Sequence, residues 1–146
     1  MTWAANAYRG RMSAHVEAIW NRALDLASPA EASRPGDVAL LTVLTFHGLV
    51  TNGGLLNAVE LHAYDDVYPS DAVVDAYRFL GLEDAAAAID NAVLEQRDLV
   101  VRGDEDDDLA DAAERIDATY TLDDDDIEAA LAVAVRNDPD DFAPID

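Results

Sequence analysis

Apolar residues along this chain recur with a period of about 3.6, the spacing that places them on one face of a helix. No segment combines strict alternation of apolar and polar residues with β-branched and aromatic residues, so we expect no strand. A chain of 146 residues with 51% hydrophobic content is long enough for one core and too short for two ordinary domains. The pattern predicts an all-α fold, in a single compact domain of about six or seven helices.

The first part of the chain predicts an amphipathic helix over residues 2–27 and a second helix over residues 38–50. Residues 38–50 are apolar nearly all round, which is typical of a central helix buried on several sides, and Asp37 is placed as its N-cap. The apolar stripe of the first helix consists of Trp3, Tyr8, Met12, Val16, Ile19, Trp20, Ala23 and Leu24.

Asn52, Gly53 and Gly54 form a motif that breaks the second helix. Backbone N–H groups in such a motif can bind an anion, but no Lys or nearby Arg completes a phosphate site, so a structural kink is the favoured interpretation. A helical pattern resumes over residues 55–64. Its predicted inward side chains are Leu55, Leu56, Val59 and His62.

Two more helices are predicted over residues 70–80 and 83–101. Pro69 and Ser70 open the first of them, and Gly81 is placed to end it in the left-handed conformation. The apolar contacts of the first are assigned to Val73, Val74, Tyr77, Phe79 and Leu80. Those of the second are assigned to Ile89, Val93, Leu94 and Leu99.

The last third of the chain predicts two acidic helices, over residues 107–119 and 127–137. Acids at the amino ends of both helices favour the helix dipole, and Asp111 can pair with Arg115 one turn later. Residues 138–146 form an acidic tail, which frays unless Phe142 and Ile145 dock on the core.

The chain is strongly acidic, with 31 Asp and Glu residues against nine Arg and no Lys, for a formal net charge of -22. Residues 1–101 hold 14 acids and 6 arginines, a net charge of -8, whereas residues 102–146 hold 17 acids and 3 arginines, a net charge of -14. Such a chain is repelled by nucleic acids and anionic membranes. Adaptation to molar salt explains acids on all faces, but their concentration in the last third points to a local role. Both explanations stay open at this stage.

The residues needed for most catalytic and metal sites are missing or wrongly spaced. The absence of Cys excludes disulfides, thiolate zinc sites and Cys nucleophiles. His15, His47 and His62 do not follow a zinc-binding spacing, and the acid runs lack the pattern of a calcium loop. His47, on an apolar helix, is most simply a hydrogen-bonded core residue. No nucleophile motif of a hydrolase is present, and we therefore expect a non-enzymatic protein without metal or cofactor.

The chain begins without a basic segment followed by an apolar run, which argues against a secretory signal. No stretch approaches the roughly 18 consecutive apolar residues of a membrane span. We therefore expect a soluble, cytoplasmic protein.

Three segments can be compared with a known family. Residues 44–57 read LTFHGLVTNGGLLN, an apolar helix that runs into Asn-Gly-Gly and two apolar residues. Residues 76–92 contain Leu-Gly-Leu between two helical stretches, the second rich in Ala, and residues 116–142 form an acidic closing segment. Together these segments resemble the DNA-mimic-protein-like family of small all-helical domains of unknown function.

The resemblance implies an all-α domain that is frequently dimeric. In the family's named member it implies an acidic surface that imitates duplex DNA and occupies a DNA-binding protein, with no catalytic residue. The usual Glu before the Asn-Gly-Gly motif and the usual aromatic residue after it are absent, because residues 48–51 contain no acid and position 55 is Leu. The long first segment with Trp3, Tyr8 and Trp20 also favours a homodimer.

Acids of the last two predicted helices are the candidate phosphate imitators. Carboxylates at helical spacing lie about 5–6 Å apart, and two adjacent helices approach the density of DNA, which carries one charge per about 3.4 Å of each strand. We expect a basic partner, such as a DNA-binding protein or transcription regulator, and no direct binding to nucleic acid. The alternative is a salt-adapted domain of unknown role. The predicted partner-binding residues are Asp106, Asp107, Asp108, Asp111, Glu114, Asp117, Asp123, Asp124, Asp125, Asp126 and Glu128.

Overall fold

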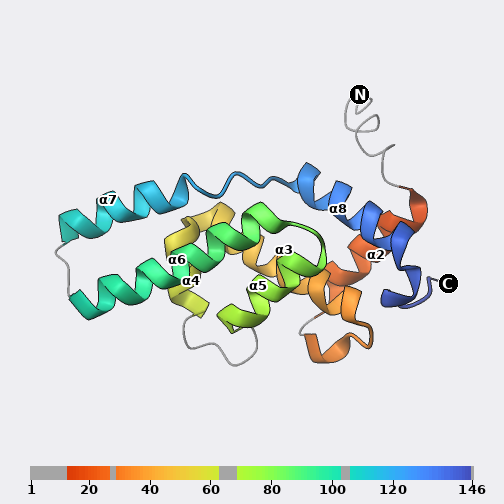
Figure 1. Cartoon of the computed structure of the whole chain (residues 1–146). Helices are drawn as coiled ribbons and strands as arrows, with labels where there is room; N and C mark the ends of the chain where they lie inside the picture. Colours follow the sequence, from red (N-terminus) through yellow and green to blue (C-terminus); the bar gives the residue numbers. More distant parts are fainter. Residues whose placement is uncertain (1–12, 27–28, 63–68, 103–105, 146) are drawn as a thin grey trace.

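The computed structural model describes residues 13–26, 29–62, 69–102 and 106–145. Within these residues the chain forms seven α-helices, two short 3-10 helices and no strand, around one hydrophobic core (Figure 1). The prediction of a single all-α domain is therefore confirmed. The elements are α2 (Ala14–Asp25), η1 (Pro29–Glu31), α3 (Pro35–Gly53), α4 (Leu55–His62), α5 (Ser70–Phe79), α6 (Glu83–Arg102), α7 (Asp106–Asp117), α8 (Asp124–Asn137) and η2 (Pro139–Asp141).

Helix α3 is the central helix that its all-round apolar pattern predicts. It packs against α2, α4 and α5, and therefore loses solvent on most of its circumference. Its start differs from the prediction, because the helix begins at Pro35 and Arg34 occupies the N-cap position. Asp37, the predicted N-cap, lies inside the first turn and is 3% exposed.

Helix α2 begins at Ala14 rather than near residue 2, because Ser13 is extended and its hydroxyl accepts a hydrogen bond from the Val16 N–H group. Ser13 is thus an N-cap that separates α2 from the preceding residues. The predicted stripe residues Trp3, Tyr8 and Met12 lie outside the described residues. Of the described stripe residues, Val16, Ile19, Trp20 and Ala23 are buried, and Leu24 is exposed.

The turn between α5 and α6 ends α5 as predicted. Gly81 has a φ of 78°, and its N–H group bonds to the Arg78 carbonyl while the Leu82 N–H group bonds to the Tyr77 carbonyl. This pair of bonds is a Schellman motif, which requires a left-handed residue that glycine adopts without strain. Two predicted inward residues are wrong, because Phe79 and Leu94 are exposed.

The end of the chain docks on the start of α3. Phe142 is buried, and its ring lies 2.7 Å from the position that a Cβ at Gly36 would occupy. The Asp37 carboxylate accepts hydrogen bonds from Arg22, at 2.8 Å, and from the Ala143 N–H group, at 2.8 Å. Arg22 also donates to the carbonyls of Ala143 and Pro144. Residues 142–144, which we call the C-terminal strap, thus join α2 to the start of α3.

Candidate partner-binding surface

The predicted acidic helices α7 and α8 follow each other along one edge of the molecule, joined by residues 118–123 (Figure 1). Helix α7 packs against α4 and α6, whereas α8 packs against α2 and η2. That acids of these two helices form rows at the density of DNA phosphates stays a prediction. The apolar faces of α7 and α8 are buried against different parts of the core.

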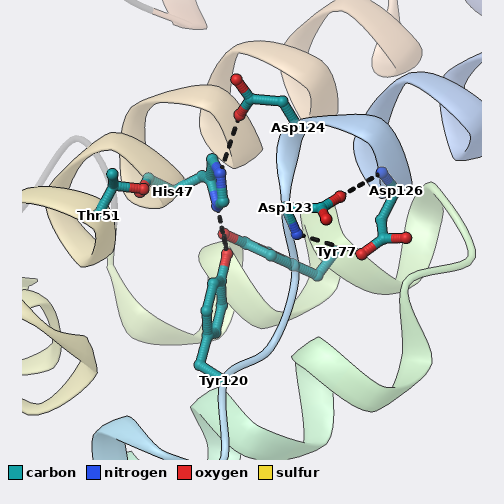
Figure 2. Close-up of polar contacts among 7 residues, drawn as sticks. All are labelled: His47, Thr51, Tyr77, Tyr120, Asp123, Asp124 and Asp126. Atoms are coloured by element: carbon teal, nitrogen blue, oxygen red, sulfur yellow. Dashed lines mark hydrogen bonds and ion pairs between the residues drawn. The ribbon is translucent and has the colours of Figure 1, made fainter. Parts of the chain in front are cut away.

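The four acids Asp123, Asp124, Asp125 and Asp126 lie at the start of α8 and are exposed. The Asp123 carboxylate accepts a hydrogen bond from the Asp126 N–H group, and the Asp126 carboxylate accepts one from the Asp123 N–H group (Figure 2). This capping box satisfies two backbone donors at the amino end of the helix. Asp125 is not part of this capping box.

Asp124 is fixed by a histidine of the core. Its Oδ1 atom lies 3.0 Å from Nε2 of His47, and Nδ1 of the same ring lies 2.9 Å from the Tyr120 hydroxyl (Figure 2). The Tyr120 hydroxyl lies 2.8 Å from that of Tyr77, which is fully buried on α5. His47 is itself 8% exposed, which confirms the prediction of a hydrogen-bonded core residue.

Elementary chemistry assigns the donor in the bond between His47 and Asp124. An ionised carboxylate only accepts, so the Nε2–H group of His47 donates a hydrogen bond to Asp124. Nδ1 of the same ring and the hydroxyls of Tyr120 and Tyr77 complete this line of hydrogen bonds. Burial raises the pKa of Tyr120 to about 12, with the charge of Asp124 acting in the same direction and the bond from Tyr77 acting against them. Burial, together with Tyr120, raises the pKa of Tyr77 further.

Asp117 serves the fold rather than the surface. Its Oδ1 atom accepts a hydrogen bond of 3.0 Å from the Leu56 N–H group at the start of α4. Its carboxylate also occupies the space that a Cβ at Gly54 would need. Gly54 has a φ of 89°, which ends α3 and allows α4 to begin in a new direction. The Asn-Gly-Gly motif is therefore the structural kink that the sequence favours, and Asp117 of α7 caps it from outside.

The remaining predicted residues divide by exposure. Asp111 and Glu114 on α7 are exposed, whereas Glu128 on α8 is buried at 7% exposed and does not reach the surface. The side chains of Asp106, Asp107 and Asp108 lie outside the described residues. The predicted pair of Asp111 with Arg115 is wrong, because Arg115 makes two bonds of 2.8 Å to Glu95 on α6.

A cavity of about 360 Å³ lies between the start of α6, the start of α8 and the segment that precedes α8. Glu83 and Asp84 line it from α6, and Asp126 lines it from α8. Sequence reasoning missed the two acids of α6, because it treated them as ordinary first-turn residues of a helix. The only signal was that two helix starts, more than forty positions apart, both carry acids. We call this cavity, together with the exposed acids of α7 and α8, the acidic edge.

Among the residues that the structure describes, no group of three His, Asp or Glu side chains is arranged to hold a metal ion. Within the same residues, no helix is both long and apolar enough to cross a membrane.

The fold and this edge define a small all-helical protein with carboxylates gathered around one cavity. A family model described as DMP19-like protein matches residues 31–138 of the chain. The chain therefore belongs to the DMP19-like protein family. Comparison with curated proteins and with solved structures gave no significant match.

Proposed function

We propose that this chain is a non-enzymatic interaction module that occupies the DNA-binding surface of a basic protein, with carboxylates in the place of phosphates. The family supports this proposal, because its name refers to a DNA mimic protein. The expected partner is a DNA-binding protein, such as a transcription regulator, whose cations are attracted by a chain of net charge -22.

The observation that carries the proposal is the acidic cavity. Acids of two separate helix starts, Glu83 and Asp84 of α6 and Asp126 of α8, line the same hollow. Negative charge on both sides of a hollow is also what the phosphates on either side of a DNA groove present. Asp111 and Glu114 extend the negative charge along α7.

Not all the predicted acids are equally suited to this role. Asp111, Glu114 and Asp125 are exposed, and the contacts given above assign them no part in holding the fold. Asp123, Asp124 and Asp126 are also exposed, but their carboxylates are held by the hydrogen bonds described above. Asp106, Asp107 and Asp108 stay in the proposal on sequence grounds. Asp117 and Glu128 are withdrawn from it, because one caps α4 and the other is buried.

Two variants that lose the same number of charges test the proposal. The edge variant carries Asp84→Asn, Glu114→Gln and Asp125→Asn. The control variant carries Asp25→Asn, Asp71→Asn and Asp75→Asn, exposed residues on α2 and on α5, which lies away from the α7–α8 edge (Figure 1). Wild-type protein is used to capture binders from a cell extract, and bound proteins are eluted with duplex DNA. The DNA-binding protein identified in this way is then titrated by calorimetry with all three forms.

We expect the edge variant to bind the purified partner at least about tenfold more weakly, because three charges that face its cations are lost. The control variant should bind within about twofold of wild type. Equal losses in the two variants would reduce the interaction to nonspecific electrostatics and contradict the proposal.

Salt adaptation is the second candidate, and a specific observation favours it. Exposed carboxylates also lie on α5, at Asp71 and Asp75, and further along α6, at Asp90. Acids on several faces keep a surface hydrated in molar salt, where charges are screened over about 3 Å. Under this reading no DNA-binding protein elutes with duplex DNA, and the two variants behave alike.

A further inference from the structure

The floor of the acidic cavity is the segment that joins α7 to α8. Thr119, Thr121 and Leu122 of this segment line the cavity. Tyr120, between the two threonines, contacts His47 and Tyr77 of the core instead (Figure 2). The floor therefore has one side against the cavity and one side against the core helices.

Tyr120 is held by two core helices at once. Its hydroxyl is hydrogen-bonded to His47 of α3 and to Tyr77 of α5, and its ring lies edge-on to Tyr77 with the centroids 6.3 Å apart. Tyr77 is fully buried and packs edge-on against Phe46, with the centroids 6.1 Å apart. Tyr120 thus holds the segment through a contact with a fully buried residue of the core.

The same imidazole also holds the start of α8. Nδ1 of His47 bonds to Tyr120 and Nε2 bonds to Asp124, so one ring connects two points four residues apart on the chain. Between these points the chain turns from the extended segment into the helix. Asp126, which lines the cavity, lies in the first turn of that helix and is tied to Asp123 by the capping box.

We propose that His47 is a positioning residue for the acidic cavity. Its ring bonds to both Tyr120 and Asp124. It thereby fixes the cavity floor, at Thr119 and Thr121, relative to the first turn of α8, where Asp126 lines the cavity. His47 does not line the cavity, and it acts through the residues that it holds. That the cavity binds a cationic side chain of a partner is part of the proposed function, and this part of the inference rests on it.

The shape of histidine explains why another buried residue does not suffice. A somewhat larger aromatic ring without nitrogens, as in His47→Phe, fills the core and loses both bonds. Tyr120→Phe keeps the aromatic ring and loses only the hydroxyl. His47→Gln keeps a donor near the place of Nε2 and can restore the bond to Asp124, which makes it the conservative variant for rescue.

The first experiment uses the protein without any ligand. Amide chemical shifts at Thr119, Thr121 and Asp126, and hydrogen exchange at the hydrogen-bonded amides of Thr119 and Asp126, are measured in His47→Phe and Tyr120→Phe. Val43→Ala, a buried change on the same helix α3, controls for lost stability. We expect local exchange at these amides to rise about tenfold in both network variants, and His47→Gln to restore Asp126 but not Thr119. If Val43→Ala gives the same local changes, His47 is only a core residue and the proposal is overturned.

The second experiment measures binding of a fluorescent hexa-arginine peptide by anisotropy. We expect His47→Phe to weaken binding about fivefold, the effect of about one hydrogen bond, with Val43→Ala unchanged. Equal binding by His47→Phe and wild type would overturn the link between the two His47 bonds and the cavity. If wild type and the edge variant bind the peptide equally, the proposed function fails instead, while the amide measurements still decide whether His47 positions the floor.

Discussion

Gly54 and Asp117 belong together, because the carboxylate fills the space that any side chain at position 54 would take. Gly54 has a φ of 89° and a ψ of 164°, a backbone region that is essentially restricted to glycine. The carboxylate in turn satisfies the Leu56 N–H group at the start of α4. The Asp117 carboxylate therefore stabilises the change of direction between α3 and α4.

At the same scale, the tyrosine network makes the fold sensitive to alkaline pH. Burial raises the pKa of Tyr120 from 10.0 to about 12, so the folded state holds its proton where the unfolded chain has lost it. The stabilisation is complete below pH 10 and is lost as the pH rises to about 12, at a cost of about 2 kcal/mol. Tyr120→Phe should show a smaller fall in urea-unfolding free energy over this range. A fall as steep as that of wild type would contradict the assignment.

For single residues, the sequence predicts whether a side chain is buried and hydrogen-bonded, but not which residues it bonds to. The apolar setting of His47 along α3 predicts a buried, hydrogen-bonded side chain, and this is what the structure shows. Its partners Tyr120 and Asp124 lie 73 and 77 positions away, and no local pattern links residues at such separations. The burial of Glu128 was not predictable either, because the helical period does not reveal which acid faces inward.

At the level of elements, α8 begins at a complete capping box. Asp123 and Asp126 close a reciprocal capping box, and Asp124 and Asp125 add negative charge to the positive end of the helix dipole. Acids at this position therefore stabilise the helix as well as charging the edge.

The two roles can be separated by comparing Asp123→Ala with Asp125→Ala, which remove the same charge from the same turn. Asp123→Ala should lower the free energy of unfolding by about 1 kcal/mol, because the Asp126 N–H group loses its acceptor. Asp125→Ala should cost no more than about 0.5 kcal/mol, because only the dipole interaction is lost. Chemical denaturation at one ionic strength measures both values, and equal losses would show that the capping box contributes nothing.

The period of apolar residues predicts the elements well and their mutual arrangement poorly. Helices α3 to α8 lie where the pattern places them, within a few residues at their ends. Exposed Phe79 and Leu94 show that a helix carries a wider apolar arc than its neighbours cover. The end-to-end order of α7 and α8 depends on which core surfaces Ile116 and Ile127 find, a matter of long-range packing that local spacing does not contain.

On the scale of the whole molecule, the charge of -22 is distributed over an acidic edge and several other exposed sites. The interior holds few of these charges among the described residues, and the buried Asp37 is paired with Arg22. Most of the electrostatic energy is therefore repulsion between exposed carboxylates, which dissolved salt reduces.

We expect the chain to be folded at about 0.15 M salt and its melting temperature to rise by about 3–8 °C between about 0.01 and 0.15 M salt, as the screening length falls from about 30 to 8 Å. The control variant with three fewer charges should show a smaller rise. Circular dichroism during heating measures both. A chain that folds only in molar salt would contradict this expectation and strengthen the reading of salt adaptation.

The C-terminal strap also dictates an order of events during synthesis on the ribosome. Arg22 and Asp37 leave the ribosome long before the backbone groups that complete their hydrogen bonds, which lie 121 and 106 positions further along the chain. Until Phe142 and Ala143 emerge, Gly36 lacks its contact with the Phe142 ring and the carboxylate of Asp37 lacks one of its donors. The contacts at the start of α3 are therefore completed only after Phe142 and Ala143 have left the ribosome.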